Sequence, residues 1–161
     1  MTLNALATAV PVDGRQSQTA LAIARGTAAR GQRQLADRAV AERMQIARRA
    51  DLVALGRHGE IVIVEIKSSV VDFRADQKWT DYRQHCDRLF FATVAAVPCE
   101  IFPADAGLIV ADAFGASVVC EAPEHRLPAA TRKTVMLRFA HAAALRLQAL
   151  SDPQEPYSGE F

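Results

Sequence analysis

Residues 48–67 read RRADLVALGRHGEIVIVEIK, and this stretch decides how the chain is organised. Its two halves flank the short sequence GRHG, so the pattern predicts two strands joined by a tight turn. The second half is dense in Ile and Val, the β-branched residues that fit a pleated sheet. Glu65 and Lys67 interrupt it two positions apart, which puts them on one face of the strand. Charges in such a strand are costly to bury unless they are paired or put to use.

The length of the turn decides which residue faces Glu65. A three-residue loop over 57–59, with Gly59 in the left-handed conformation, pairs Gly56 with Glu60 and brings Asp51 opposite Glu65. Directly opposed residues share a face, with their Cβ atoms roughly 5 Å apart. A two- or four-residue loop would put the two carboxylates on opposite faces. The site hypothesis therefore contains a register prediction.

Two carboxylates at that separation raise each other's pKa, and a divalent cation between them removes the repulsion. Carboxylate and water oxygens are hard ligands that suit Mg²⁺ or Mn²⁺. Lys67 shares the face of Glu65, so its ammonium is placed to orient a water molecule or to stabilise charge on a phosphate. Burial would lower the pKa of Lys67 and the carboxylates would raise it. We predict Asp51, Glu65 and Lys67 as catalytic residues, with Asp51 and Glu65 as the metal ligands.

An Asp followed about a dozen residues later by Glu-x-Lys resembles the active site of the PD-(D/E)XK nuclease superfamily. A wider likeness, over about residues 20 to 148, is to the MmcB-like family of DNA-repair endonucleases. The wider likeness is carried by residues 48–52, 64–69, 72–76, 78–79, 86–87 and 107–112. One departure from the superfamily motif is Ala50, which stands where the motif has Pro.

The resemblance implies a restriction-endonuclease-like fold, which is a mixed β-sheet flanked by helices. It also implies the activity of a Mg²⁺- or Mn²⁺-dependent deoxyribonuclease that hydrolyses phosphodiester bonds of DNA during repair. The residues alone leave two other functions open. One is a nucleic-acid-binding module on the same fold, with weak or no catalysis. The other is a protein in which the three charged groups form only a buried ion network.

Composition bounds the remaining possibilities. A chain of 161 residues with 50% hydrophobic residues is long enough for one globular domain. We expect a flexible lead-in over residues 1–16, the domain over 17–150 and a flexible tail over 151–161. The net charge of +1 gives no overall signature of nucleic-acid binding. Three Cys without a C-x-x-C pair, and no long apolar run, predict a cytoplasmic protein without a membrane span.

Apolar periodicity predicts an α/β order of elements. Helices are expected over about residues 17–36, 72–86 and 129–149, and further strands over about 39–46, 89–94, 108–111 and 117–120. The second helix should pack through Ala75, Trp79, Tyr82 and Cys86, which places Trp79 in the core rather than against a base. The last helix should pack through Met136, Phe139, Ala140, Ala143, Leu147 and Leu150.

Basic residues near the predicted site are candidates for contacts with DNA. Arg suits phosphate oxygens because its planar fork binds them with two hydrogen bonds. Arg49 should share the face of Asp51, while the adjacent Arg48 points the other way and either pairs structurally or touches a phosphate. Lys78 lies off the apolar face of its helix and is a third candidate. A symmetric homodimer stays open, because many nucleases cut both strands as dimers.

Three further acids are candidates for a supporting role at the site. Glu42 falls in the first predicted strand, and a solvated charge at the sheet edge explains it equally well. Asp72 and Asp76 fall in the first turns of the predicted second helix, where the helix dipole favours acids. Ser69 three residues before Asp72 resembles a capping box.

Overall fold

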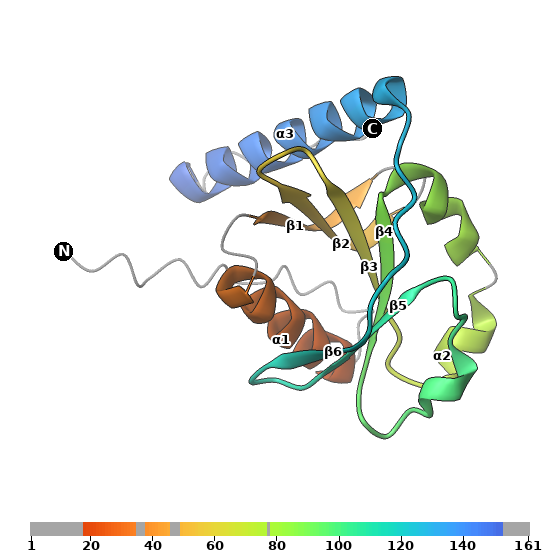
Figure 1. Ribbon diagram of the computed structural model, residues 1–161. Helices are drawn as coiled ribbons and strands as arrows, with labels where there is room; N and C mark the ends of the chain where they lie inside the picture. The colour runs from red at the N-terminus through yellow and green to blue at the C-terminus, as the bar shows by residue number, and fades with distance from the viewer. Residues whose placement is uncertain (1–17, 35–37, 46–48, 77, 153–161) are drawn as a thin grey trace.

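The computed structural model describes residues 18–34, 38–45, 49–76 and 78–152, with only the backbone at 28–34, 38–45 and 49 (Figure 1). The elements follow the expected α/β order. In sequence they are α1 (Gln18–Gln34), β1 (Arg38–Gln45), β2 (Arg49–Gly56), β3 (Ile61–Ile66), α2 (Val70–Ala75), the 3₁₀ helix η1 (Trp79–His85), β4 (Arg88–Thr93), the 3₁₀ helix η2 (Cys99–Ile101), β5 (Gly107–Ala111), β6 (Ala116–Cys120) and α3 (Ala129–Ser151).

The strands of the described chain form a six-stranded sheet in the order β1-β2-β3-β4-β5-β6. The pairs β1–β2, β2–β3 and β5–β6 are antiparallel, whereas β3–β4 and β4–β5 are parallel. Parallel neighbours need a crossover connection, and α2 with η1 provides the one between β3 and β4. The expected α/β class with a mixed sheet flanked by helices is confirmed.

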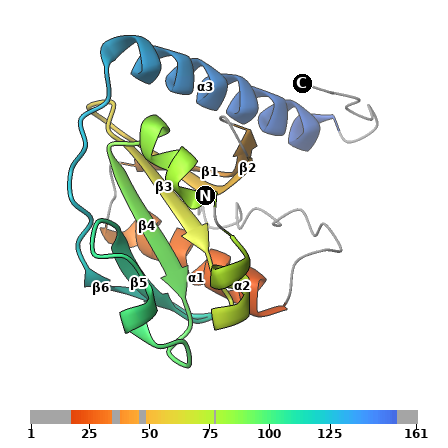
Figure 2. The ribbon, with the colours of Figure 1, turned by 90° about the vertical axis from the view of Figure 1, so that its right-hand side faces the viewer.

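The helices lie on both faces of the sheet (Figures 1 and 2). Ile23 and Ala24 of α1 pack in one apolar cluster with alternate residues of β2 and β3, among them Leu52 and Val64. A second cluster joins η1 and α3 to the other face of the sheet. Its buried members are Ala50, Val53, Ile61, Ile63, Tyr82, Cys86, Leu89, Leu127, Val135 and Phe139. Along β3 the side chains alternate between the two clusters, with Ile61 and Ile63 in this one and Val62 and Val64 in the α1 cluster.

The hairpin between β2 and β3 has the predicted three-residue loop. Gly56 N–H donates to Glu60 O at 2.8 Å, and Gly59 has a φ of 86°, in the left-handed region. A Cβ atom is disfavoured there, which explains the glycine. The ladder runs from the pair Leu55–Ile61 to the pair Leu52–Val64, which is the predicted register. The register prediction is confirmed up to that last pair, one position before Asp51 and Glu65.

The single helix predicted over residues 72–86 is wrong, because it is divided in two. The first part, α2, ends at Ala75, which is exposed rather than packed, and η1 begins at Trp79. Between them Asp76 has an extended backbone (φ −95°, ψ 94°), and its carboxylate accepts a hydrogen bond from Lys78 N–H at 2.9 Å. A short acidic side chain that bonds to nearby backbone in this way competes with helix formation. Trp79 is partly buried against the core, as expected.

The predicted packing face of α3 is also wrong, apart from Phe139. Phe139 is buried together with Val135, but Leu147 and Leu150 are 66% and 57% exposed. Val135, Phe139 and Ala142 are spaced i, i+4 and i+7, so they form an equally regular stripe. The helix is apolar on two sides, and periodicity alone does not choose between them.

The ends of the chain bear on the domain prediction. Residues 1–17 and 153–161, which hold the expected lead-in and most of the expected tail, lie outside the described residues. Ser151, where the tail was predicted to start, is the last residue of α3.

In the described part of the chain, no helix combines the length and the apolar character that a membrane span requires. Cys86, Cys99 and Cys120 form no disulfide.

Gly26 on α1 is expected to be intolerant of a side chain. A Cβ atom there would clash with the backbone oxygen of Asp112 and lie 2.5 Å from that of Gly115, and neither oxygen can rotate away. Gly26→Ala should therefore destabilise the fold by about 1–3 kcal/mol in urea denaturation, even though Ala favours helices.

Gly56→Ala is the matched control for that variant. Its added methyl group would meet only the flexible side chain of Glu60, which can turn aside. We expect a change in unfolding free energy below about 1 kcal/mol. A Gly26→Ala protein as stable as the wild type would show that α1 does not pack tightly on the β5–β6 turn.

Candidate functional site

The β2–β3 ladder gives way to side-chain hydrogen bonds at the end opposite the turn. Asp51 N–H donates to Glu65 Oε1 at 3.3 Å, and Ile66 N–H donates to Asp51 Oδ2 at 2.9 Å. Each carboxylate is thus oriented by the backbone of the other strand. The structure brings Asp51 and Glu65 together at this end of the hairpin.

Lys67 follows directly after β3 and is anchored to β4. Its N–H donates to Ala92 O at 2.9 Å, and the hydroxyl of Thr93 donates to its carbonyl oxygen at 2.7 Å. The ammonium Nζ lies 3.9 Å from Glu65 Oε2 and 2.6 Å from Asp76 Oδ2. Glu65 and Lys67 are only 4% and 5% exposed. Lys67 therefore lies near Glu65, but its nearer partner is Asp76.

Burial dominates the electrostatics of Glu65. Burial, reinforced by the negative charge of Asp51, raises the pKa of Glu65 to about 8, although Lys67 acts in the other direction. For Lys67, burial would lower the pKa, but the hydrogen bond to Asp76 and the charge of Glu65 outweigh it, so the pKa is raised. The ammonium is thus held in its charged form. Two carboxylates, those of Glu65 and Asp76, lie within 4 Å of this one ammonium.

The oxygen donors of the site suit Mg²⁺ or Mn²⁺ in an open site, in which the protein supplies only some of the ligands. Within the described residues, no three His, Cys, Asp or Glu side chains are grouped as a complete metal cage. Asp51 and Glu65 offer two carboxylates, and Mg²⁺ is commonly held by one or two carboxylates together with water and substrate phosphates. A cation held there would favour the charged form of Glu65, whose pKa is raised by burial and by the charge of Asp51.

The two acids of α2 have different roles. Asp72 Oδ2 accepts hydrogen bonds from Ser68 N–H at 2.9 Å and from the Ser68 hydroxyl at 3.2 Å, while Asp72 N–H donates to the N-cap Ser69 Oγ at 3.1 Å. Asp72 thus orders the chain just beyond Lys67. Asp76 ends α2 instead of lying in its first turns as predicted, and it contacts the ammonium. Figure 2 shows α2 beyond the carboxyl end of β3.

The other predicted site residues lie partly outside the described part of the chain. Lys78 is exposed, and its N–H donates to Asp76, so it lies next to the site. Arg48 lies outside the described residues, and only the backbone of Arg49 is described. Glu42 pairs in the ladder with Leu52, and only its backbone is described. Its role therefore stays a prediction.

Thr93 is the residue at the site that sequence reasoning missed. It is fully buried at the end of β4, and its hydroxyl fixes the carbonyl of Lys67. The available signal was a Thr at the end of the otherwise apolar run LFFAT. A buried hydroxyl needs a hydrogen-bond partner, and a neighbouring strand is where it would find one.

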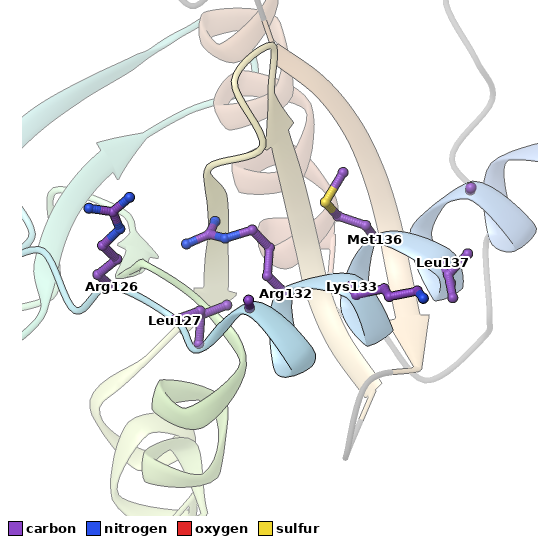
Figure 3. Close-up of a pocket in the computed structure, with 8 residues that line it drawn as sticks. Arg126, Leu127, Arg132, Lys133, Met136 and Leu137 are labelled. Carbon is purple, nitrogen blue, oxygen red and sulfur yellow. The ribbon is translucent and has the colours of Figure 1, made fainter.

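A pocket of about 620 Å³ lies elsewhere, around the first turns of α3 (Figure 3). Arg126, Arg132, Lys133 and Met136 are among its lining residues, and Asp51, Glu65 and Lys67 are not. Arg132 is occupied with Asp87 and with the carbonyl of Gly59. The pocket is therefore separate from the carboxylate site.

Comparison with known proteins agrees with the likeness in the sequence. A family model described as DNA repair protein MmcB-like matches residues 7–154. A solved structure, that of a protein of unknown function from Silicibacter pomeroyi, is 43% identical with a TM-score of 0.81, and the match covers 90% of this chain and 99% of that chain. None of the curated proteins matches. The family match indicates a role in DNA repair. Because the family model spans most of the sequence, this chain belongs to the MmcB-like family of DNA repair proteins.

Proposed function

We propose that this protein is a Mg²⁺- or Mn²⁺-dependent endonuclease that cleaves DNA during repair. The single observation that carries the proposal is the arrangement of Asp51 and Glu65, each fixed by the other's strand, with the Lys67 ammonium 3.9 Å from Glu65. The proposal includes a restriction-endonuclease-like fold, with which the mixed sheet and its helices on both faces agree. Membership of a DNA repair family supports DNA as the substrate.

In this mechanism, Asp51 and Glu65 would hold the cation, while the backbone N–H groups of Ile66 and Asp51 keep both carboxylates oriented. The cation would lower the pKa of a water molecule and polarise the scissile phosphate. Lys67 stays protonated, so it acts as a hydrogen-bond donor to the attacking water or to the charged phosphate oxygens, and not as a base. Hydrolysis breaks one P–O bond and leaves a phosphate monoester and a hydroxyl group.

Lys78 is the described basic residue best placed to contact the DNA backbone in this proposal. It is exposed, and its backbone bond to Asp76 ties it to the same carboxylate that holds Lys67. Arg48 and Arg49 remain proposed contacts on the chain that leads into β2. Contacts of this kind position DNA without reading its sequence, and they weaken as salt is added.

A second candidate is a nucleic-acid-binding module with weak or no catalysis. The observation in its favour is that Lys67 is almost fully buried and held at 2.6 Å by Asp76. This candidate predicts DNA binding that falls steeply with salt, without cleavage under any divalent metal. An ion network of purely structural purpose predicts instead that Lys67→Ala lowers stability by about 3–5 kcal/mol.

The test is cleavage of single-stranded, branched and damaged DNA by the full chain. We expect cleavage with Mg²⁺ or Mn²⁺ and no cleavage with a chelator. Asp51→Ala and Lys67→Ala should both lose activity, because the first removes a proposed metal ligand and the second removes the ammonium. Lys133→Ala, a change in the remote pocket, is the control and should retain activity. Cleavage that persists in both site variants would remove the proposed site. Binding without cleavage in every metal would select the binding module.

A further inference from the structure

The ammonium of Lys67 is shared unequally between two acids. It lies 2.6 Å from Asp76 Oδ2 but 3.9 Å from Glu65 Oε2. The Glu65 side chain is 5% exposed, whereas that of Asp76 is 25% exposed and lies nearer to solvent. When Glu65 is ionised, as a metal ligand must be, attraction alone would favour a close contact with this more deeply buried acid, because the lower dielectric strengthens it there. The short bond to Asp76 is the competing contact that the structure shows.

We propose that Asp76 is a positioning residue that holds the Lys67 ammonium away from Glu65 and so keeps the Glu65 carboxylate available to a cation. The inference rests on the proposed function for the purpose of that cation. The position of Lys67 itself is a property of the chain without metal or DNA.

The backbone of Lys67 cannot follow its side chain. Ala92 and Thr93 hold both its N–H and its carbonyl oxygen against β4, with distances of 2.9 and 2.7 Å. Nζ can therefore move only by side-chain rotation, and two carboxylates lie within 4 Å of it. A charge-assisted hydrogen bond as short as that to Asp76 is strong enough to select one of these positions.

The position of Asp76 depends on the break between α2 and η1. Its extended backbone follows the last residue of α2, and its Oδ1 accepts the N–H of Lys78 at 2.9 Å while Oδ2 faces Lys67. Asp76 thus ends α2 through its backbone N–H, while its carboxylate holds both the N–H of Lys78, the N-cap residue of η1, and the ammonium of Lys67. The break between α2 and η1 therefore places Asp76 against Lys67. The apolar periodicity of the sequence does not predict this break.

The direct test is the crystal structure of Asp76→Asn without metal. The amide removes the negative charge at nearly constant shape, so we expect Nζ of Lys67 to swing to about 3 Å from Glu65. Asp76→Glu, which keeps the charge, should leave the ammonium away from Glu65 and also serves if the amide variant folds poorly. A Lys67 that remains in place in Asp76→Asn would overturn the proposal.

A second test measures Mn²⁺ binding by calorimetry, without DNA. Asp76→Asn should weaken Mn²⁺ binding by about tenfold, because the ammonium then neutralises Glu65. Asp72→Asn is the matched control, since the hydrogen bonds of this neighbouring carboxylate go to Ser68 and the helix cap, and its charge has a smaller effect on Lys67 than that of Asp76. It should weaken binding clearly less. Equal effects of the two variants would overturn the proposal.

A double-mutant cycle shows whether Asp76 acts through Lys67. In a Lys67→Ala background, Asp76→Asn should change the Mn²⁺ affinity no more than Asp72→Asn does, because there is no ammonium to displace. An undiminished effect would contradict the proposal.

In DNA cleavage, Asp76→Asn should raise the metal concentration needed for half-maximal rate more than it lowers the rate at saturating metal.

Failure of this inference differs from failure of the proposed function. If the wild type binds no Mn²⁺ and cuts no DNA, the nuclease proposal falls, and with it the purpose assigned to the free Glu65. The position of Lys67 in the Asp76→Asn crystal still decides whether Asp76 holds the ammonium. If the wild type cuts DNA and the ammonium does not move, only the role of Asp76 falls.

Discussion

Replacing Asp87 by Ala is expected to lower the free energy of unfolding by about 3–5 kcal/mol, the range for breaking a buried ion pair. Asp87 is 5% exposed, and its carboxylate accepts hydrogen bonds from Ile61 N–H at 2.8 Å and from Leu127 N–H at 3.0 Å. Arg132 binds both carboxylate oxygens at 2.7 Å. The loss would leave two backbone donors and a guanidinium without their acceptor, where β3, β4 and α3 meet.

The contribution of Asp87 to the free energy of unfolding changes with pH in a definite direction. Burial would raise the pKa of Asp87, but the hydrogen bonds from Arg132, Ile61 and Leu127 outweigh it, so the pKa lies below its usual 3.8. A lowered pKa means that the contribution is complete above pH 3.8 and is lost as the pH falls through the folded-state value. The stability gap between wild type and Asp87→Asn should therefore narrow in acid.

The control for Asp87 is an ion pair at the surface. Glu124 accepts from Arg88 at 3.3 Å and is largely exposed, so Glu124→Ala should change stability by less than about 1 kcal/mol. Urea denaturation followed by circular dichroism measures both variants. A loss for Asp87→Ala no larger than that for Glu124→Ala would show that the buried hydrogen bonds do not hold α3 to the sheet.

Replacing Glu65 by Gln is expected to have opposite effects on stability and on activity. Cleavage of DNA should fall by about 100-fold or more, because a charged metal ligand is lost. The metal-free protein should become more stable by about 2–4 kcal/mol at pH 8, because each unit of pKa shift corresponds to about 1.4 kcal/mol. Gln can still accept the N–H of Asp51, which Glu65 Oε1 accepts at 3.3 Å.

The sign for Glu65 follows from a raised pKa. Its folded-state pKa of about 8 exceeds the ordinary value of 4.5, so the folded protein holds this proton more tightly than the unfolded chain does. The wild type should therefore lose stability as the pH rises from 4.5 to 8, relative to Glu65→Gln, and the difference should level off above pH 8.

Thermal unfolding in metal-free buffer across that pH range tests the prediction. Lys133→Ala, in the remote pocket, is the matched control and should show the same pH profile as the wild type. A Glu65→Gln protein less stable than wild type at pH 8 would mean that the buried carboxylate is compensated within the fold. The site would then carry no excess of negative charge for a cation to relieve.

The sequence by itself determined the local geometry of the hairpin. Gly59 and the three-residue loop set the register, and the two-residue period placed Asp51, Glu65 and Lys67 together. Both rules act between residues that are neighbours along the chain or across one turn, so a single sequence contains them. The order of helices and strands followed from periodicity in the same way.

Only the tertiary structure decided how the helices meet the sheet. Which side of α3 is buried depends on packing against residues far away in the sequence, such as Val53 and Ile63, and Arg132 reaches Asp87 across 45 positions. The break between α2 and η1 likewise depends on tertiary structure, because the Asp76 carboxylate there contacts both Lys67 and Lys78. Periodicity reports how regular a segment is, whereas these choices depend on which charged and apolar partners the folded chain brings to it.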